Sequence, residues 1–286
     1  MKNIKYLLEA TILVFLLVIF RIVGIKAARF ISSKIMCKIG PYFRSRRTIE
    51  KNLELVFKNI NNQEKNLIIK NMWSAYGKIL AEYVFMRKFR ESNSAQSITV
   101  TGQKTLNEIK KSGKPVIFIS GHFDNFELMA LHIEKSGIDL TAIYRPLNNI
   151  FLNPLMEIIR KKFICKKQIK KGLTGTRLIL KNFKKNSSIA LMIDQRVSQG
   201  IKVSFFSKTA LTTSIPAQFV KKFKCQIVPI YIERKTDDNF NLKIFDPIIF
   251  SNSETIESIT LSLNKILENM ILNNPNQWIW THNRWK

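Results

Sequence analysis

Four short apolar runs, separated by stretches of helical periodicity, constrain the fold of this 286-residue chain more than any other feature. Their sequences are PVIFIS (Pro115–Ser120), LTAIY (Leu140–Tyr144), SIALMID (Ser188–Asp194) and QIVPIYI (Gln226–Ile232). Continuous apolar runs of this length are typical of strands buried on both faces, as in parallel sheets. Strands that alternate with helices predict an α/β fold with a mostly parallel central sheet flanked by helices.

The amino-terminal segment has a different character. Residues 6–25 are about as long as a membrane-spanning helix, with an uninterrupted apolar centre at Leu13–Phe20. Two lysines precede this segment, as in a signal peptide, but no small-x-small cleavage site follows, so we favour a membrane anchor over a signal peptide, and either over a buried core helix. Residues 21–47 hold eight basic side chains against two upstream, which predicts that the bulk of the chain faces the cytoplasm. A helix lying in the interface would use the same residues to dock on anionic lipid.

No internal repeat or long linker divides the rest of the chain. We therefore expect an anchor helix at residues 1–30 and a single cytoplasmic domain at residues 31–286. Within that domain the sequence predicts three parts: a helical part at 45–90, an α/β part at 98–250, and a carboxy-terminal helix with a Trp-rich, basic tail at 251–286. The tail sequence WIWTHNRWK either packs on the core or rests at a membrane interface, where Trp is favoured.

The charge balance predicts an anionic partner. The chain has 47 Lys and Arg against 20 Asp and Glu, a formal net charge of +27. Nucleic acid, an acidic membrane face, a phosphorylated lipid and an acidic carrier protein all fit this charge. Residues 160–171 alone hold seven basic side chains and no acid, which suits a solvated face, carrier docking or lipid headgroups. The three cysteines are widely spaced, which favours neither a disulfide framework nor a zinc site and fits a reducing, cytoplasmic location.

The sequence SGHFDNFE places His122 directly after the first apolar run, at the carboxyl end of a predicted strand. Ligands collect at such ends in parallel sheets. A helix amino terminus just beyond His122 would keep its ring neutral, so that it can act as a base, and Glu127 could accept the other ring N–H. The alternative is that Asp124 and Glu127 form a helix-capping pair and His122 is an ordinary loop residue.

Several catalytic motifs are missing from the chain. It has no G-x-S-x-G elbow, no H-E-x-x-H motif, no P-loop and no Cys beside a His in sequence. Their absence disfavours a serine enzyme with a covalent intermediate, a zinc hydrolase and a nucleotide hydrolase. A His/Glu pair without a protein nucleophile suits direct attack by a substrate hydroxyl on an activated acyl group.

Four blocks in order resemble a known family. HFDNFE is similar to the H-x4-[DE] signature of glycerolipid acyltransferases. Three further blocks resemble the branch that contains the lipid A late acyltransferases of the lauroyl/myristoyl type. These blocks are IYRPLNN (143–149), ALMIDQRVSQGIKVSFF (190–206) followed by the strand IVPIYIER, and the closing PNQWIWTHNRWK (275–286). The resemblance runs from the anchor to the last residue.

This resemblance implies transfer of a fatty acyl chain from acyl carrier protein to a hydroxyl of a phosphorylated lipid A precursor at the inner membrane, without a metal or bound cofactor. His122 would deprotonate the hydroxyl, and Glu127 would orient and stabilise His122. Arg145 and Arg160 are candidates for contacts to phosphate, because guanidinium binds phosphate through paired hydrogen bonds. Asp194 matches the Asp of the third block and is a further candidate for substrate binding.

The chain departs from the family pattern at four positions, and none of them is His122 or Glu127. They are Ile150, Ser207, Asn276 and Asn283. These departures bear on the acceptor or the chain preference, so a glycerophospholipid or another glycolipid stays an alternative acceptor. The rival of another class is a basic, membrane-associated nucleic-acid-binding protein, but no helix-turn-helix, zinc-finger or ribonucleoprotein signature supports it, and we expect no nucleic-acid partner.

Overall fold

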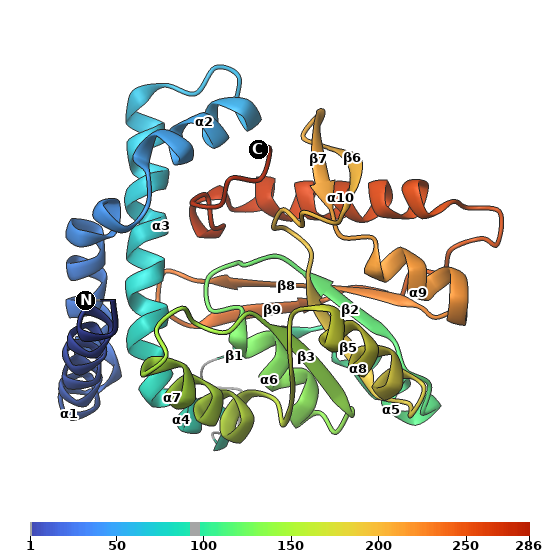
Figure 1. The fold of residues 1–286 in the computed structure, drawn as a ribbon, viewed down its shortest axis with the longest axis horizontal. Helices are drawn as coiled ribbons and strands as arrows, with labels where there is room; N and C mark the ends of the chain where they lie inside the picture. Colours follow the sequence, from blue (N-terminus) through green and yellow to red (C-terminus); the bar gives the residue numbers. More distant parts are fainter. Residues whose placement is uncertain (1, 92–97) are drawn as a thin grey trace.

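A computed structural model describes residues 2–91 and 98–286 (Figure 1). The helices are α1 (Lys2–Phe43), α2 (Arg46–Val56), α3 (Asn62–Glu82), α4 (Met86–Glu91), α5 (Gln103–Ser112), α6 (Glu127–Lys135), α7 (Leu152–Ile159), α8 (Leu173–Phe183), α9 (Ile215–Phe223) and α10 (Ile256–Asn273). The strands are β1 (Ile98–Thr101), β2 (Ile117–Ser120), β3 (Leu140–Tyr144), β4 (Lys167–Lys170), β5 (Ser188–Met192), β6 (Ile201–Phe205), β7 (Lys208–Thr212), β8 (Ile227–Arg234) and β9 (Phe240–Ile244). Short 3₁₀ turns η1 (Tyr83–Phe85) and η4 (Pro275–Gln277) and a π-helical turn η3 (Arg160–Ile164) complete the order.

Seven strands form one sheet in the order β1-β9-β8-β2-β5-β3-β4. Strands β8, β2, β5, β3 and β4 run parallel, whereas β9 runs antiparallel to β8 and parallel to β1. The four apolar runs of the sequence are β2, β3, β5 and β8, which confirms the predicted mostly parallel sheet with flanking helices. All four residues of β2, the middle strand, are buried, as its unbroken apolar sequence requires.

The carboxy-terminal part packs against the molecule. In Figure 1, α10 and the β6–β7 hairpin lie above the sheet and α7 lies below it. Trp278 and Trp280 of the tail are buried, and Trp285 stacks on Phe205 of the hairpin. The amide of Asn52 on α2 donates to the carbonyl oxygen of Trp280 at 2.8 Å. Packing on the core is therefore the correct interpretation for Trp278 and Trp280, and the membrane-interface alternative is wrong for them.

Helix α1 is kinked at Gly24, whose φ of +81° favours glycine. The helix is apolar and long enough to cross a membrane, and most of its apolar window is exposed rather than packed against the protein. Its exposed apolar side chains before the kink include Ile4, Leu7, Leu8, Ile12, Phe15, Val18 and Ile22. This outward apolar face makes α1 a candidate membrane anchor.

One face of α1 packs along α3, and the two helices run side by side in Figure 1. After the kink, the packed face is partly polar, with Arg29 and Ser32 both buried. The approach is close at Gly77 of α3, where a Cβ would lie 2.3 Å from the carbonyl oxygen of Ser32. The contact thus continues on both sides of residue 30, where the sequence predicted the end of the anchor.

Replacing Gly77 with Ala should therefore destabilise the protein by about 1–3 kcal/mol, the usual cost of forcing an extra methyl group into a packed contact. We expect a melting temperature several degrees lower for the detergent-solubilised Gly77→Ala protein. Lys70→Ala, on an exposed position of the same helix, is the control and should leave the melting temperature almost unchanged. Equal melting temperatures for Gly77→Ala and the wild type would contradict the close α1–α3 contact.

Candidate active site

The register of two parallel strands brings the central pair of the site together. Ser120, the last residue of β2, is paired with Met192, the last residue of β5. His122 and Asp194 each lie two residues beyond this pair, at the carboxyl edge of the sheet. The Nδ1 atom of His122 is 2.8 Å from Oδ1 of Asp194. Backbone pairing thus delivers a histidine and a carboxylate to each other from segments 72 residues apart.

Asp194 is buried and accepts three hydrogen bonds. Besides the ring of His122, its Oδ2 atom accepts from the backbone N–H of His122 at 2.9 Å and from the indole N–H of Trp278 at 3.0 Å. Burial alone would raise the pKa of Asp194, but the charge and hydrogen bonds of His122 outweigh burial and hold the pKa below its ordinary value. Asp194 is therefore an ionised, fixed acceptor.

An ionised carboxylate only accepts hydrogen bonds, so the neutral His122 ring carries its proton on Nδ1. The lone pair is then on Nε2, the atom that can take a proton from a substrate. Burial disfavours the charged ring, but the nearby Asp194 carboxylate, with a further contribution from Glu127, raises the pKa of His122 above its ordinary value. This arrangement makes the ring a stronger base than a free imidazole.

Glu127 does not make the contact that the sequence suggested. Its Oε1 atom accepts from the hydroxyl of Tyr83 at 2.6 Å and from Nε and Nη2 of Arg160 at 2.8 and 2.6 Å. The expectation that Glu127 accepts the ring N–H of His122 is wrong, because Asp194 occupies that role. Glu127 acts on His122 through its charge, across space.

The helix-capping alternative is also wrong. Helix α6 begins at Glu127, its N-cap position is Phe126, and no side chain caps it. Asp124 has a left-handed backbone with φ of +31° and binds Arg234 instead. Both acids of the motif are therefore committed to arginines rather than to the helix end.

The two candidate arginines differ in their surroundings. Arg160, in η3, is partly buried and hydrogen-bonded to Glu127. Its Cζ atom lies over the ring of Tyr144, 5.6 Å from the ring centroid. Arg145 directly follows β3 and is exposed, with no hydrogen bond or ion pair to any residue in the described ranges. The structure thus brings together His122, Asp194, Glu127 and Arg160, and leaves Arg145 open to solvent.

Two residues of the site were missed in the sequence. Tyr83, which is buried at the end of α3, bonds Glu127, and Trp278 bonds Asp194. No neighbouring residue in the sequence indicates a role for Tyr83, because its partner Glu127 is 44 residues away. Trp278 lies in the closing sequence block, and its buried N–H needs an acceptor, which is the signal that could have found it. In the part of the chain that the structure describes, no group of three or more His, Cys, Asp or Glu side chains is arranged to hold a metal ion.

Comparison with known proteins places this site in context. The family model described as bacterial lipid A biosynthesis acyltransferase matches residues 2–286. The lipid A biosynthesis lauroyltransferase of Escherichia coli K12 is 23% identical over 257 residues, which cover 87% of this chain and 82% of that protein. The palmitoleoyltransferase of the same organism is 23% identical over 262 residues, 90% of this chain and 84% of that protein. A lipid A biosynthesis acyltransferase of Haemophilus influenzae is 19% identical over 274 residues, 93% of this chain and 84% of that protein.

The geometry predicts the effect of Asp194→Asn on the proton affinity of His122. The neutral amide removes the charge that raises the pKa of His122, so that pKa should fall below the wild-type value. Titration of the histidine side chains by ¹⁵N NMR measures this directly, and the chain has three histidines to resolve. Asp139→Asn, at an exposed position paired with Lys167, is the matched control and should leave the titration of His122 unchanged. An unaltered titration in Asp194→Asn would refute the pairing.

Proposed function

This chain belongs to the bacterial lipid A biosynthesis acyltransferase family, and from that premise we propose that it transfers a fatty acyl chain from acyl carrier protein to a hydroxyl of a phosphorylated lipid A precursor. The observation that carries the proposal is a His122 ring oriented by Asp194, with its Nε2 atom available as a base. That is the group which direct attack by an acceptor hydroxyl needs. The relatives named above, which act in lipid A biosynthesis, support the acceptor class.

In the proposed reaction, the acceptor hydroxyl gives its proton to Nε2 of His122 while its oxygen bonds to the carbonyl carbon of the acyl thioester. The tetrahedral adduct then collapses, the carbon–sulfur bond breaks, and the proton passes from His122 to the leaving thiolate. The products are an ester and a free carrier thiol. The proposed acyl transfer uses no metal and no bound cofactor.

The neighbouring carboxylates stabilise the charged ring that forms during this transfer. Asp194 is hydrogen-bonded to Nδ1, so it fixes the tautomer and the orientation of His122. Glu127 adds negative charge nearby, while its pairing with Arg160 fixes its position. Together they favour proton transfer to His122.

Basic residues around the site suit anionic substrates. Arg145 is exposed beside the strand ends and is our candidate for binding a phosphate of the acceptor. Arg160 has two of its nitrogens committed to Glu127, so we assign it to positioning first and to phosphate second. The six lysines between Lys161 and Lys171 are exposed, which suits docking of an acidic carrier protein.

The proposed location is the inner membrane, with the catalytic domain facing the cytoplasm. The exposed apolar face of α1 supports membrane association. The excess of basic residues that follows the apolar segment supports the cytoplasmic orientation. An acyl carrier protein would reach the active site from that side.

His122→Ala should reduce acyl transfer at least about a hundredfold, the usual effect of removing a general base. The assay offers carrier protein loaded with C12, C14 or C16 chains to a tetra-acylated, sugar-bearing lipid A precursor in detergent. His132→Gln is the control, because His132 on α6 bonds Gln103 and none of the residues proposed for the site. No product from the folded wild type with any donor would contradict the proposed reaction, and a glycerophospholipid acceptor would be tried next.

The pH dependence of kcat/KM should follow the protonation of His122. The base must be neutral to act, so kcat/KM should rise with pH through the pKa of His122 in the free enzyme. Because Asp194 raises that pKa, the midpoint should lie above 6.5 in the wild type. In Asp194→Asn the residual activity should have a lower midpoint. A wild-type profile that stays flat from pH 6 to 9 would remove His122 from the role of base.

A further inference from the structure

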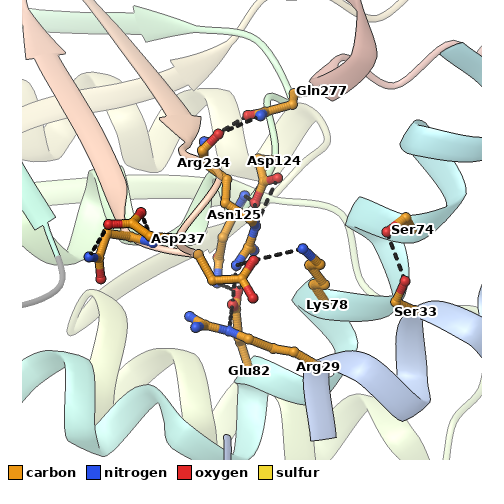
Figure 2. Close-up of polar contacts among 12 residues, drawn as sticks. Arg29, Ser33, Ser74, Lys78, Glu82, Asp124, Asn125, Arg234, Asp237 and Gln277 are labelled. Carbon is orange, nitrogen blue, oxygen red and sulfur yellow. Dashed lines mark hydrogen bonds and ion pairs between the residues drawn. The ribbon is translucent and has the colours of Figure 1, made fainter. Parts of the chain in front are cut away.

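A buried cluster of charged residues includes Asp124, which lies two residues after His122 in the β2–α6 turn (Figure 2). Its members come from four separate segments: Arg29 from α1, Glu82 from the end of α3, Asp124 from the β2–α6 turn and Arg234 from the end of β8. Each is less than 10% exposed, and Glu82 is completely buried. The hydrogen bonds of the proposed catalytic residues described above do not involve these four side chains.

Glu82 is the centre of the cluster. Its Oε1 atom accepts from Nε of Arg29 and from Nη1 of Arg234, both at 2.6 Å. Its Oε2 atom accepts from Nη2 of Arg234 at 2.9 Å and from the side-chain amide of Asn125 at 2.7 Å. Burial opposes the charge of Glu82, but Arg234 and Arg29 outweigh it and lower the pKa of Glu82. One carboxylate thus joins α1, β8 and the turn beside His122.

Arg234 extends this network to the turn itself. Its Nη2 and Nε atoms donate to Oδ1 of Asp124 at 2.6 and 3.1 Å. The backbone of Arg234 is held as well, because Gln277 accepts from its N–H and donates to its carbonyl oxygen, both at 2.7 Å. The carbonyl oxygen of Gln277 accepts from the N–H of Asp124 at 2.8 Å. Asp124 is therefore fixed through both its side chain and its backbone.

Asp124 needs such support because its backbone is unfavourable. A φ of +31° is uncommon for a residue other than glycine and persists only where the surroundings impose it. Asp124 follows His122 by two residues, so its conformation sets the path of the chain at His122. The backbone N–H and the ring of His122 both have to meet the same Asp194 carboxylate.

The charges of the cluster balance. Beside the cluster, Lys78 donates to Asp238, whose Oδ1 atom also lies 3.7 Å from Nη1 of Arg234. With this pair included, three cations (Arg29, Arg234, Lys78) face three carboxylates (Glu82, Asp124, Asp238). Removing one partner of a buried ion pair leaves a charge without compensation, which is costly. Loss of Arg29 would remove one of the two arginines bound to Glu82, so Glu82 would draw more strongly on Arg234 and weaken its hold on Asp124.

We propose that this cluster positions His122, and that Arg29 makes helix α1 part of the catalytic positioning network as well as a candidate anchor. The proposal rests on the function proposed above, since it assigns a role to the same site. Arg29 and Glu82 touch neither His122 nor Asp194, so they are positioning residues and act through Asp124. The order of contacts runs from α1 through Glu82 and Arg234 to the turn.

The proposal predicts a remote effect on the protonation of His122. Among the described residues, Asp194, Glu127, Arg160 and His282 are titratable or charged groups that act on His122 or feel its charge. Of these, Asp194 is the one hydrogen-bonded to the ring, so a loosened turn would weaken its effect most. In Arg29→Gln the proton affinity of His122 should therefore fall about tenfold toward its ordinary value.

We would test this with ¹⁵N-histidine NMR titrations of full-length Arg29→Gln protein in detergent. Lys26→Gln, one turn earlier on α1 and exposed, is the matched control. The same samples would be assayed for acyl transfer, with kcat expected to fall about tenfold in Arg29→Gln and KM expected to stay near the wild-type value. A titration of His122 in Arg29→Gln that matches Lys26→Gln would overturn the proposal. Because the titration needs no substrate, it separates failure of this inference from failure of the proposed reaction.

A second variant guards against a merely structural effect. The double variant Arg29→Gln with Glu82→Gln removes one charge of each sign and leaves Arg234 paired with Asp124. If charge balance holds the turn, the His122 titration of the double variant should lie nearer the wild type than that of Arg29→Gln. A further fall in the double variant would show that the contacts of Glu82, rather than the balance of charge, hold the turn, and would support the place of Glu82 among the positioning residues.

Discussion

The in-register pairing of β2 with β5 is the constraint on which the site depends. Two parallel strands that end level at Ser120 and Met192 present their next residues side by side. That places His122 against Asp194 without any need for the two segments to be close in sequence. The short apolar strands that form the core also fix the geometry of the polar pair at their ends. The accuracy of the site is thus a property of the sheet, whose backbone hydrogen bonds are shielded from water.

Each buried carboxylate near this edge has a fixed basic partner. Asp194 has His122, Glu127 has Arg160, and Asp124 and Glu82 share Arg234, with Arg29 added on Glu82. The chain has 27 more basic than acidic side chains, so a basic partner is available for each of these carboxylates. For Asp194 and Glu82 burial opposes the charge, but their basic partners outweigh burial and hold the pKa of each carboxyl below its ordinary value. His122 differs from the arginines because the charge of an imidazole can change near neutral pH, which suits the proton transfer that we propose for this pair.

The sequence predicted the strands because apolar runs report burial directly, and it predicted His122 because the residue stands at a strand end. It did not predict the partner of His122. Glu127 lay five residues away and suggested a local contact, whereas the actual partner came from the neighbouring strand. His122 and Asp194 each lie two residues beyond a strand end, and this equal spacing would have indicated Asp194 as the partner. It does so only when the register between β2 and β5 is known. Glu82 gave a weaker signal, as the one acid in the apolar stretch ILAEYVFM (79–86), where burial would call for a cationic partner.

Helix α1 differs in character before and after its kink at Gly24. Before Gly24 its outward face is apolar, with Phe15 65% exposed, which fits lipid better than water. After Gly24 its inward face includes the buried Arg29, which an anchor that served only to tether the domain would not require. Glu82 compensates the charge of the buried Arg29 and is committed at the same time to Arg234. The candidate anchor helix is therefore joined by ion pairs to the turn that carries His122, and the helix and this turn belong to one structural unit.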